Sequence, residues 1–447
     1  MATAIRSLSE WATRHAQPLG GRAQDYDALL DDIGDARFVL LGEATHGTHE
    51  FYRERAVLTR RLIAERGFHA VCVEADWPDA YRVNLHVRGQ GRDHLAVESL
   101  GGFKRFPTWM WRNTDVLEFV SWLARHNEKH AVATGFYGMD LYSLFASITA
   151  VCKYLDKIDP FEAALARSRY ACFDHYGDDC EAYGHKASLD LSASCEREVL
   201  NQLVALRERA AEWTKRDGIA MEDAVFSMEQ NARLVRNAEE YYRSLLGGRV
   251  KTWNLRDSHM VQTLHELTMF LDRRVGRSKI VVWAHNSHLG DARATSMRGI
   301  GEHNVGQLVR ERFPDDSYLI GFTTYDGTVS AASAWDRPVE KQRVRPALEG
   351  SYEAMFHGLA KERGMARFVV PLRGARAAHW HSQMQLERAI GVVYAPRTER
   401  VSHYFDADLA AQFDAVIHID RTRAVEPLET TPTWTSGEPP ETYPFAL

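Results

Sequence analysis

The fold class of this chain is indicated by the segment R-F-V-L-L-G-E-A-T-H-G-T-H-E-F-Y-R-E-R-A-V-L-T-R-R-L (Arg37–Leu62). Its first residues, Arg37–Leu41, form a short apolar run that is typical of a buried strand. A turn with two histidines follows, and apolar residues then recur at helical spacing over His49–Arg66. A strand that leads directly into a helix predicts one unit of an α/β sheet domain.

Similar apolar runs recur along the rest of the chain. They are rich in Val, Ile, Leu and Phe without strict alternation, as a parallel sheet covered on both faces requires. We therefore expect an α/β fold with a largely parallel central sheet flanked by helices. The further predicted strands are Ala70–Val73, Ala131–Gly135, Lys279–Ala284, Ser317–Phe322, Arg367–Val370, Gly391–Ala395 and Ala415–Ile419.

The middle of the chain has a different pattern, with charged helical stretches and no strand signal. The clearest of these stretches are Ser194–Lys215, Met221–Leu246 and Asp257–Arg274. We expect residues 144–272 to form a helical subdomain that walls a cleft or acts as a plain buttress. Residues 1–143 and 273–447 are then the two parts of the sheet domain, and the Pro-rich tail after Pro427 should run irregularly over the surface.

The composition excludes several classes of protein. The 447 residues are 45% hydrophobic, and 55 Lys and Arg stand against 61 Asp and Glu, without a basic stretch that could neutralise nucleic acid. The N-terminus lacks the apolar core of a signal peptide, and no apolar run approaches the ~20 residues that span a bilayer. We expect a cytoplasmic protein without nucleic-acid or membrane partners.

The five cysteines are Cys72, Cys152, Cys172, Cys180 and Cys195. Their number is odd and they form no C-x-x-C pair, which argues against a disulfide framework and against a thiolate zinc site. We expect reduced thiols with structural roles.

Ionisable side chains gather where the predicted strands end. Carboxyl ends of parallel strands meet at one edge of a sheet, where ligands bind. Polar groups beside buried apolar runs cost free energy unless they are paired or used, so their convergence predicts a functional cleft. The residues are Glu43, His46 and His49 after the first strand, Glu74 after the second, Asp140 after the third, and His285 and His288 after Lys279–Ala284.

Arg55 adds a separate signal, because it lies in the apolar stripe formed by Phe51, Leu58 and Leu62. A buried guanidinium stays charged, so it needs a carboxylate such as Glu43 or Glu74, or a bound anion. The alternative is an arginine that extends past the stripe to solvent.

Common catalytic and cofactor motifs are absent. The chain has no G-x-S-x-G, no H-E-x-x-H, no complete G-x-G-x-x-G and no Walker sequence, so we expect no cofactor. The pairs His46/His49 and His285/His288 leave a metal site open as an alternative. Metal-free acid–base chemistry needs a histidine beside a carboxylate, and His46 follows Glu43 by three residues.

Several long motifs together resemble the erythromycin esterase family. Besides the opening segment they are V-C-V-E-A-D-W, F-P-T-W-M-W-R-N, V-V-W-A-H-N-S-H-L-G-D, T-E-R-V-S-H-Y-F and F-D-A-V-I-H-I-D. The resemblance implies a sheet domain, a helical subdomain and a deep cleft between them. It also implies that water hydrolyses a macrolide lactone, a reaction of antibiotic resistance, without a covalent intermediate or an essential metal.

The resemblance assigns the general base to His46 and supporting roles to Glu43, Glu74, Arg55, His285 and His288. His49, Asp140 and His403 are second-tier candidates. We expect Glu43 or Glu74 to orient His46, and Arg55 with one of the other histidines to meet charge on the carbonyl oxygen. The alternatives are a metal-dependent hydrolase that uses the same residues and a binding protein for haem or another large ligand.

Overall fold

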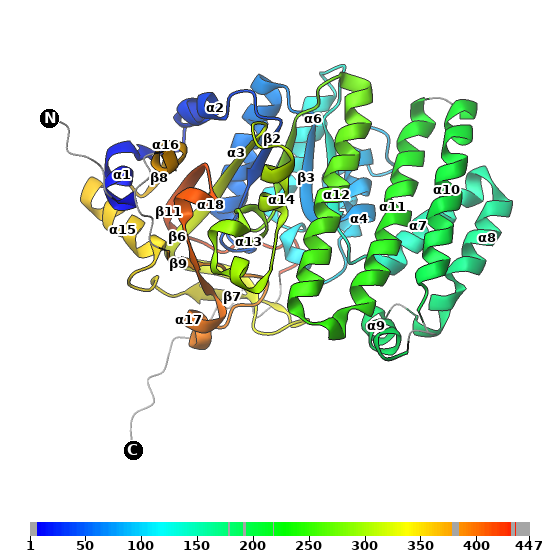
Figure 1. The fold of residues 1–447 in the computed structure, drawn as a ribbon. Coiled ribbons are helices and arrows are strands. Elements are labelled where there is room, and N and C mark those ends of the chain that lie inside the picture. The colour runs from blue at the N-terminus through cyan, green and yellow to red at the C-terminus, as the bar shows by residue number, and fades with distance from the viewer. Residues whose placement is uncertain are drawn as a thin grey trace.

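The computed structural model describes residues 7–177, 179–190, 194–217, 219–377, 384–430 and 434. At its centre is a nine-stranded sheet in the order β1-β8-β11-β6-β2-β5-β3-β4, with β7 paired to β6 (Figure 1). The inner strands run parallel, while β1, β7 and β8 are antiparallel to their neighbours. The largely parallel α/β sheet expected from the sequence is confirmed.

The strand bounds place the carboxyl ends of β2, β3, β4 and β5 at one edge of the sheet. These strands are β2 (Phe38–Leu41), β3 (Ala70–Asp76), β4 (Gly135–Asp140) and β5 (Ile280–Trp283). The others are β1 (Gln17–Pro18), β6 (Ser317–Ala332), β7 (Val339–Val344), β8 (Arg367–Pro371) and β11 (Ala415–Thr422). A separate pair consists of β9 (Gln385–Arg388) and β10 (Tyr404–Ala407).

Each face of the sheet packs on its own hydrophobic core. Alternate side chains of a strand point to opposite faces, so Phe38 and Leu40 of β2 join one core while Val39 and Leu41 join the other. The first core includes residues of α12 (Arg249–Val275), and the second includes residues of α3 (His49–Arg66). This double burial is why the strands read as continuous apolar runs.

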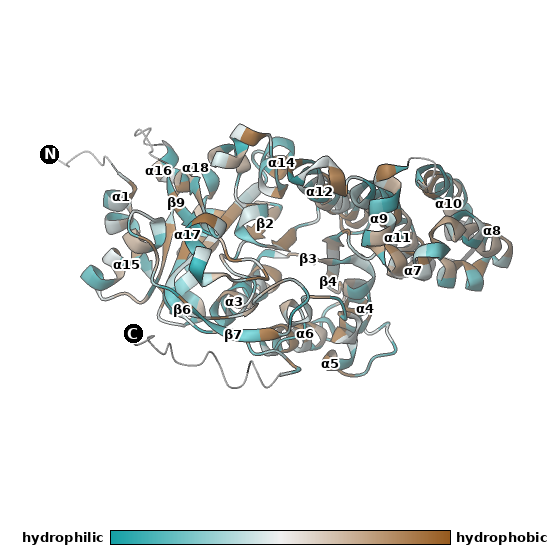
Figure 2. Ribbon diagram, turned by 90° about the horizontal axis from the view of Figure 1, so that it is seen from below, coloured by the Kyte–Doolittle hydropathy of each residue, from teal (hydrophilic) through white to brown (hydrophobic). Residues whose placement is uncertain are grey.

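The helices cover both faces and extend beyond the β4 edge. Figure 1 places α7, α8, α10 and α11 beyond that edge, and Figure 2 shows hydrophilic and hydrophobic residues mixed along α8 and α10. These helices are α7 (Leu144–Ile158), α8 (Pro160–Tyr170), α9 (Cys180–Leu189), α10 (Glu196–Asp217) and α11 (Ile219–Arg243). The division into a sheet domain and a helical subdomain stays a prediction.

The remaining helices are mostly short and connect the strands. They are α1 (Leu8–His15), α2 (Asp27–Ile33), α4 (Trp77–Val87), α5 (Ala96–Ser99), α6 (Thr114–Asn127), α13 (Asn286–Leu289), α14 (Val305–Arg312), α15 (Tyr352–Arg363), α16 (Arg373–Ala377), α17 (Glu399–Ser402) and α18 (Leu409–Gln412). In the described part of the chain, none of the helices is long and apolar enough to cross a membrane. The cytoplasmic location stays a prediction, and the tail after Pro427 lies mostly outside the described residues.

Two predicted strands are wrong. Ala131–Gly135 is not a strand, because Asn127 at the end of α6 accepts a hydrogen bond from Thr134 N–H (2.8 Å) and donates one to its carbonyl (2.9 Å), which holds this stretch as a connection. The strand begins at Gly135 instead. Gly391–Ala395 contributes only an isolated bridge between Val393 and Ala332.

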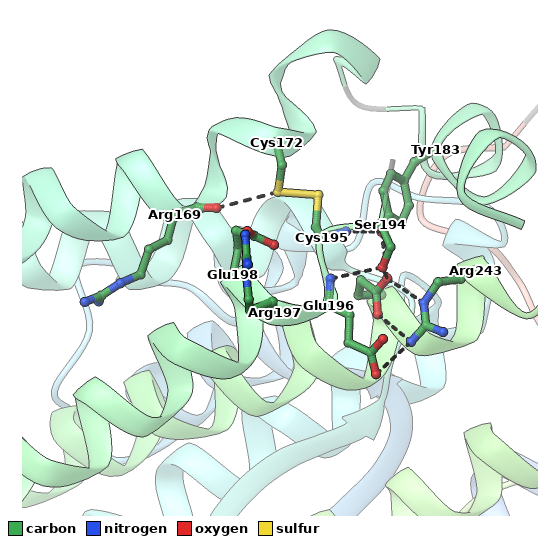
Figure 3. The surroundings of a disulfide bond; sticks show 10 residues. Arg169, Cys172, Tyr183, Ser194, Cys195, Glu196, Arg197, Glu198 and Arg243 are labelled. Carbon is green, nitrogen blue, oxygen red and sulfur yellow. Dashed lines mark hydrogen bonds and ion pairs between the residues drawn. A yellow bond between two sulfur atoms is a disulfide. The ribbon is translucent and has the colours of Figure 1, made fainter. Parts of the chain in front are cut away.

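The prediction that the thiols are reduced is wrong for one pair, because Cys172 and Cys195 form a disulfide (Figure 3). Their Cα atoms lie 6.0 Å apart although 23 positions separate them in the sequence. The packing of α8 against α10 brings the two segments together, and neither the count nor the spacing of the cysteines reports such a contact. Cys72, Cys152 and Cys180 are free.

Candidate active site

A cavity of about 450 Å³ lies at the strand-end edge. The predicted site residues that line it are His46, Glu74, Asp140, His285, His288 and His403. Glu43, Arg55 and His49 do not line it. The strand ends thus bring most of the predicted residues together at one place, as the geometry of a parallel sheet requires.

The turn that carries His46 depends on two glycines. A Cβ atom on Gly42 would lie 2.1 Å from the side-chain oxygen of Asn286, and one on Gly47 would lie 1.8 Å from the Ser330 carbonyl oxygen. Only glycine therefore allows the turn to pack this closely on its neighbours. The hydroxyl of Tyr52 also donates a hydrogen bond to the His46 carbonyl (2.9 Å). These contacts hold the imidazole in one position.

His46 is the outer member of a buried chain of contacts. Its Nδ1 donates a hydrogen bond to Glu43 Oε1 (2.9 Å), and Glu43 Oε2 lies 2.6 Å from Nη2 of Arg55. Because a carboxylate accepts the Nδ1 proton, Nε2 carries the lone pair. Nε2 lies 4.0 Å from Glu74 Oε1. The sequence left open whether Glu43 or Glu74 orients His46, and the contact distances favour Glu43.

Arg55 is completely buried beneath the site, as its place in an apolar stripe predicts. Its guanidinium carbon lies over the rings of Tyr52 (4.5 Å) and Trp283 (5.1 Å). Its N–H groups are not aligned for hydrogen bonds with any described residue, so the ion pair with Glu43 is its main polar contact. A desolvated pair of this kind is strongly interdependent.

Glu74 is the acidic centre of the cavity wall. Its Oε1 accepts a hydrogen bond from Nη2 of Arg256 (2.7 Å) and lies 3.4 Å from Nε2 of His288. Its Oε2 accepts one from the backbone N–H of His285 (2.9 Å). Burial alone would raise the pKa of Glu74, but the interactions with His288, with His46 when it is protonated, and with Arg256 outweigh burial and hold this pKa well below its ordinary value.

Asp140 at the end of β4 completes the Arg256 site. It accepts hydrogen bonds from Nε (2.9 Å) and Nη2 (2.7 Å) of Arg256. Burial opposes ionisation of Asp140, but Arg256 lowers its pKa below the ordinary value. Arg256 thus connects the ends of β3 and β4, and Asp140 acts on the site through this arginine.

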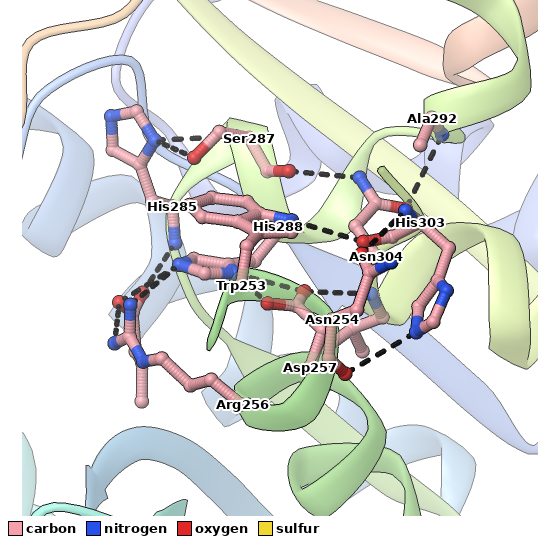
Figure 4. Close-up of polar contacts among 12 residues, drawn as sticks. Trp253, Asn254, Arg256, Asp257, His285, Ser287, His288, Ala292, His303 and Asn304 are labelled. Carbon is pink, nitrogen blue, oxygen red and sulfur yellow. Dashed lines mark hydrogen bonds and ion pairs between the residues drawn. The ribbon is translucent and has the colours of Figure 1, made fainter. Parts of the chain in front are cut away.

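His288 lies between the carboxylates of Asp257 and Glu74. Figure 4 shows it beside Asp257 and Trp253. Its Nδ1 donates to Asp257 Oδ1 (2.9 Å), its Nε2 faces Glu74, and Trp253 stacks on its ring at 4.5 Å between centroids. Burial and the nearby charge of Arg256 act to lower the pKa of His288. The negative charges of Asp257 and Glu74 have the larger effect and raise this pKa to about 9. A pKa of about 9 favours the charged form of His288 at neutral pH, although Nη1 of Arg256 also lies 3.1 Å from its Nε2.

The charge on His288 predicts a loss of stability in alkali. The pKa of about 9 in the fold exceeds the ordinary 6.5, so the contribution is fully present below pH 6.5 and is lost as pH rises through 9. We expect the free energy of unfolding to fall by on the order of 3 kcal/mol through this group between neutral pH and about pH 10. Thermal melts of wild type and His288→Gln across this range test it, because the variant should lack this part of the decline. Parallel profiles of the two proteins would contradict it.

His285 is neutral and presents an N–H group. Burial, protonated His46 and His288 all act to lower its pKa, which falls to about 3, although Glu74 and the Ala44 carbonyl act in the other direction. Nδ1 accepts a hydrogen bond from the backbone N–H of Ser287 (3.2 Å), so the ring proton lies on Nε2. Nε2 is buried and forms no hydrogen bond with the described residues. The centroid of the His285 ring lies 4.8 Å from the centroid of the His46 ring.

The other two predicted histidines differ in position. His49 lies off the cavity, where Nδ1 contacts Asp115 (2.7 Å) and Nε2 contacts Arg423 (2.7 Å). His403 lines the cavity, but its Nε2 already accepts the backbone N–H of Ala395 (3.0 Å). Both arrangements are those of structural histidines.

The residues of the cavity do not fit a metal ion. Within the residues that the structure describes, no group of three or more His, Cys, Asp and Glu side chains could hold one. Glu74 already contacts two cations, Arg256 and His288, so a divalent ion beside it would face like charges. The described donor set therefore does not favour the metal-dependent alternative.

Known proteins match this chain over nearly its whole length. The family profile described as erythromycin esterase covers residues 63–422. The chain belongs to the erythromycin esterase family. It is 23% identical to a Bacillus subtilis protein named "Putative hydrolase YbfO", covering 92% of this chain and 90% of that protein. It is also 21% identical to the erythromycin esterase type II of Escherichia coli, over 75% and 81% of the two chains.

Solved structures share the erythromycin esterase fold. A Bacillus cereus protein superposes with a TM-score of 0.77 at 18% identity, covering 94% of this chain and 98% of that one. A mutant of the erythromycin esterase EreC in its open conformation superposes with a TM-score of 0.65 at 16% identity, covering 96% and 99%. At these identities the similarity concerns the fold, and family membership supports hydrolase activity.

Arg256 and Asp257 contact the site but were not among the predicted residues. Both belong to α12, which packs on the sheet from outside the strand-end loops. Asp257 precedes Met260, Val261 and Leu264 at helical spacing, the same pattern that identified Arg55. The sequence therefore held a signal for Asp257, whereas the contacts of Arg256 depend on how α12 packs against β3 and β4.

Proposed function

We propose that this member of the erythromycin esterase family hydrolyses an ester or lactone with water that His46 activates, without a covalent intermediate. The contact chain from Arg55 through Glu43 to His46 supports the proposal most strongly. It holds Nδ1 of His46 as a donor and leaves Nε2 on the cavity side without a hydrogen bond to a described residue. A lone pair on a positioned, cavity-lining imidazole is what a general base requires.

In the first step, Nε2 of His46 removes a proton from water as the water oxygen bonds to the carbonyl carbon. The imidazolium that forms lies between Glu43, 2.9 Å from Nδ1, and Glu74, 4.0 Å from Nε2. Two carboxylates therefore stabilise the charge that develops on His46.

The negative charge on the carbonyl oxygen is met by Nε2–H of His285. This neutral donor lies close to His46 and has no hydrogen-bond partner among the described residues, which leaves its N–H for a substrate oxygen. Arg55 does not line the cavity, and the ring nitrogens of His288 already contact Asp257 on one side and Glu74 and Arg256 on the other. We therefore assign Arg55 to the positioning of Glu43 and His288 to the positioning of Glu74.

In the second step the carbon–oxygen bond to the alkoxide breaks, and His46 returns its proton to the alkoxide oxygen. The products are a carboxylic acid and an alcohol, joined in one molecule when the substrate is a lactone. His46 ends neutral, as it began, and each oxygen of water or substrate stays in a product.

A macrolide lactone is the proposed substrate class. The cavity is large, and its lining includes the aromatic side chains of Phe103, Phe106, Trp111, Trp253 and Trp335, which suit an extensive apolar ligand. The Escherichia coli relative is named an erythromycin esterase. Hydrolysis of such a ring would inactivate an antibiotic.

A hydrolysis screen tests the proposal. Purified protein is incubated with macrolide lactones, simple lactones and chromogenic esters, and products are examined by mass spectrometry. We expect the addition of one water to at least one compound, and no covalent adduct on the protein. A stable acyl-protein adduct during turnover would contradict the direct attack of water. Hydrolysis of simple esters without hydrolysis of any macrolide would support the proposed reaction and exclude macrolides as the substrate class.

A further inference from the structure

A second acidic group lines the cavity beside the proposed catalytic residues. Glu74 and Asp76 both belong to β3, and a strand rises about 3.3 Å per residue, so Asp76 lies roughly 7 Å further along the strand. Asp79, in the first turn of α4, lines the same part of the cavity. The proposed reaction uses neither aspartate.

Asp76 has an unsatisfied oxygen in this position. The residue is only 5% exposed, and its Oδ2 accepts hydrogen bonds from Nε (3.2 Å) and Nη2 (3.0 Å) of Arg105. Its Oδ1 is buried and has no hydrogen-bond partner among the described residues. A buried carboxylate oxygen without a partner is unfavourable unless a ligand supplies a donor.

Asp79 is a second acceptor without a partner. Its carboxylate forms no ion pair or hydrogen bond with a described residue, and Gly102 packs close to it, since a Cβ there would lie 3.2 Å from Oδ1. Burial and the charge of Asp76 raise the pKa of Asp79 to about 7, while Arg105, Arg82 and Lys104 act in the opposite direction. The two aspartates therefore repel each other in the empty cavity.

Aromatic residues line the same cavity as the two aspartates. Phe103, Phe106 and Tyr142 line the cavity with them. The ring of Tyr142 already receives a cation, because the guanidinium carbon of Arg105 lies 4.7 Å from its centroid. Carboxylates combined with ring faces are the groups that bind an organic ammonium ion.

We propose that Asp76 and Asp79 form a subsite for a protonated amine on the substrate. The inference rests on the proposed function, in that it takes this cavity to be the substrate cavity. An ammonium group has three donors, so it can satisfy both the free oxygen of Asp76 and the carboxylate of Asp79. Its charge also removes the repulsion between them, which a neutral hydroxyl group cannot do.

The test compares hexylammonium with hexanol, two probes of matched length. Each is titrated into the protein while tryptophan fluorescence is followed, since Trp111 lines the cavity, and each is tested as a competitor of ester hydrolysis. We expect hexylammonium to bind at least about tenfold more tightly than hexanol. In Asp79→Asn the ratio should fall to about one, whereas Glu118→Gln, which removes an exposed carboxylate on α6, should keep it.

The pH dependence gives an independent measurement. Hexylammonium should bind more tightly as pH rises from about 6 to 8, because Asp79 loses its proton in this range, and Asp79→Asn should show no such rise. Circular dichroism confirms that the variant is folded.

The outcomes separate this inference from the proposed function. Equal binding of the two probes by wild type, or an unchanged ratio in folded Asp79→Asn, overturns the subsite even if esters are hydrolysed. Binding of hexylammonium that depends on Asp79, in a protein that hydrolyses no ester or lactone, supports the subsite and refutes the proposed function.

Discussion

Replacement of His46 by Asn is expected to lower kcat by about 10²–10⁴ while the protein stays folded. Asn retains a polar side chain of similar reach but cannot take a proton from water. Glu43 still accepts a hydrogen bond, and the ion pair of Glu43 with Arg55 is kept, so the framework of the site should persist. Steady-state kinetics on any compound that the screen identifies, with a thermal melt, measure both effects.

His49→Asn is the matched control, because it makes the same substitution three positions along in the same turn. His49 contacts Asp115 and Arg423 rather than the cavity, so its loss should leave kcat within a few-fold of wild type after correction for folded protein. Near-full activity of His46→Asn on a true substrate would exclude His46 as the base. An equal loss in both variants would point to damage of the turn.

Replacement of Arg55 by Met is expected to lower the free energy of unfolding by about 3–5 kcal/mol, because it leaves the charge of Glu43 buried without its partner. Activity should fall as well, since Glu43 would no longer be held against Nδ1 of His46. Denaturant unfolding measures the first effect, and kcat below the melting range measures the second.

Arg60→Met on the same helix is the control, because its partner Glu118 is 70% exposed and water can solvate the charge that is left unpaired. It should change the stability by no more than about 1 kcal/mol. The double variant Glu43→Gln/Arg55→Met removes both buried charges, so it should recover part of the stability while activity stays low. A single variant Arg55→Met as stable as Arg60→Met would contradict the buried-pair interpretation.

Most strands of the sheet could be predicted because strands that are buried on both faces consist of apolar residues. Strands covered on both faces, such as β2 and β5, consist of apolar residues, and the sequence shows them directly. The error at Ala131–Gly135 has the same origin, because an apolar run beside a strand reads like the strand itself. There the side chain of Asn127 bonds both backbone groups of Thr134, a contact that no local pattern reports.

Some residues of the candidate site could be predicted from the sequence, and others could not. Residues that follow a strand, such as Glu43 and His285, could be placed at a common edge because every parallel strand ends there. Arg256 could not, since it reaches Glu74 and Asp140 from the N-terminal part of α12, just before the helical stretch that the sequence predicts from Asp257. The disulfide of Cys172 and Cys195 depends likewise on the packing of two helices.

Local patterns in the sequence indicate the α/β class, the gathering of histidines and carboxylates at the strand ends, and the buried position of Arg55. These follow from periodicity and from the cost of burying charge, which act over a few residues. Contacts between distant segments are needed to establish that Glu43 rather than Glu74 contacts Nδ1 of His46, that the pKa of His285 is lowered, and that the pKa of His288 is raised. Those properties depend on distances of a few ångströms between side chains from different elements, because electrostatic interaction in a buried site is set by such contacts.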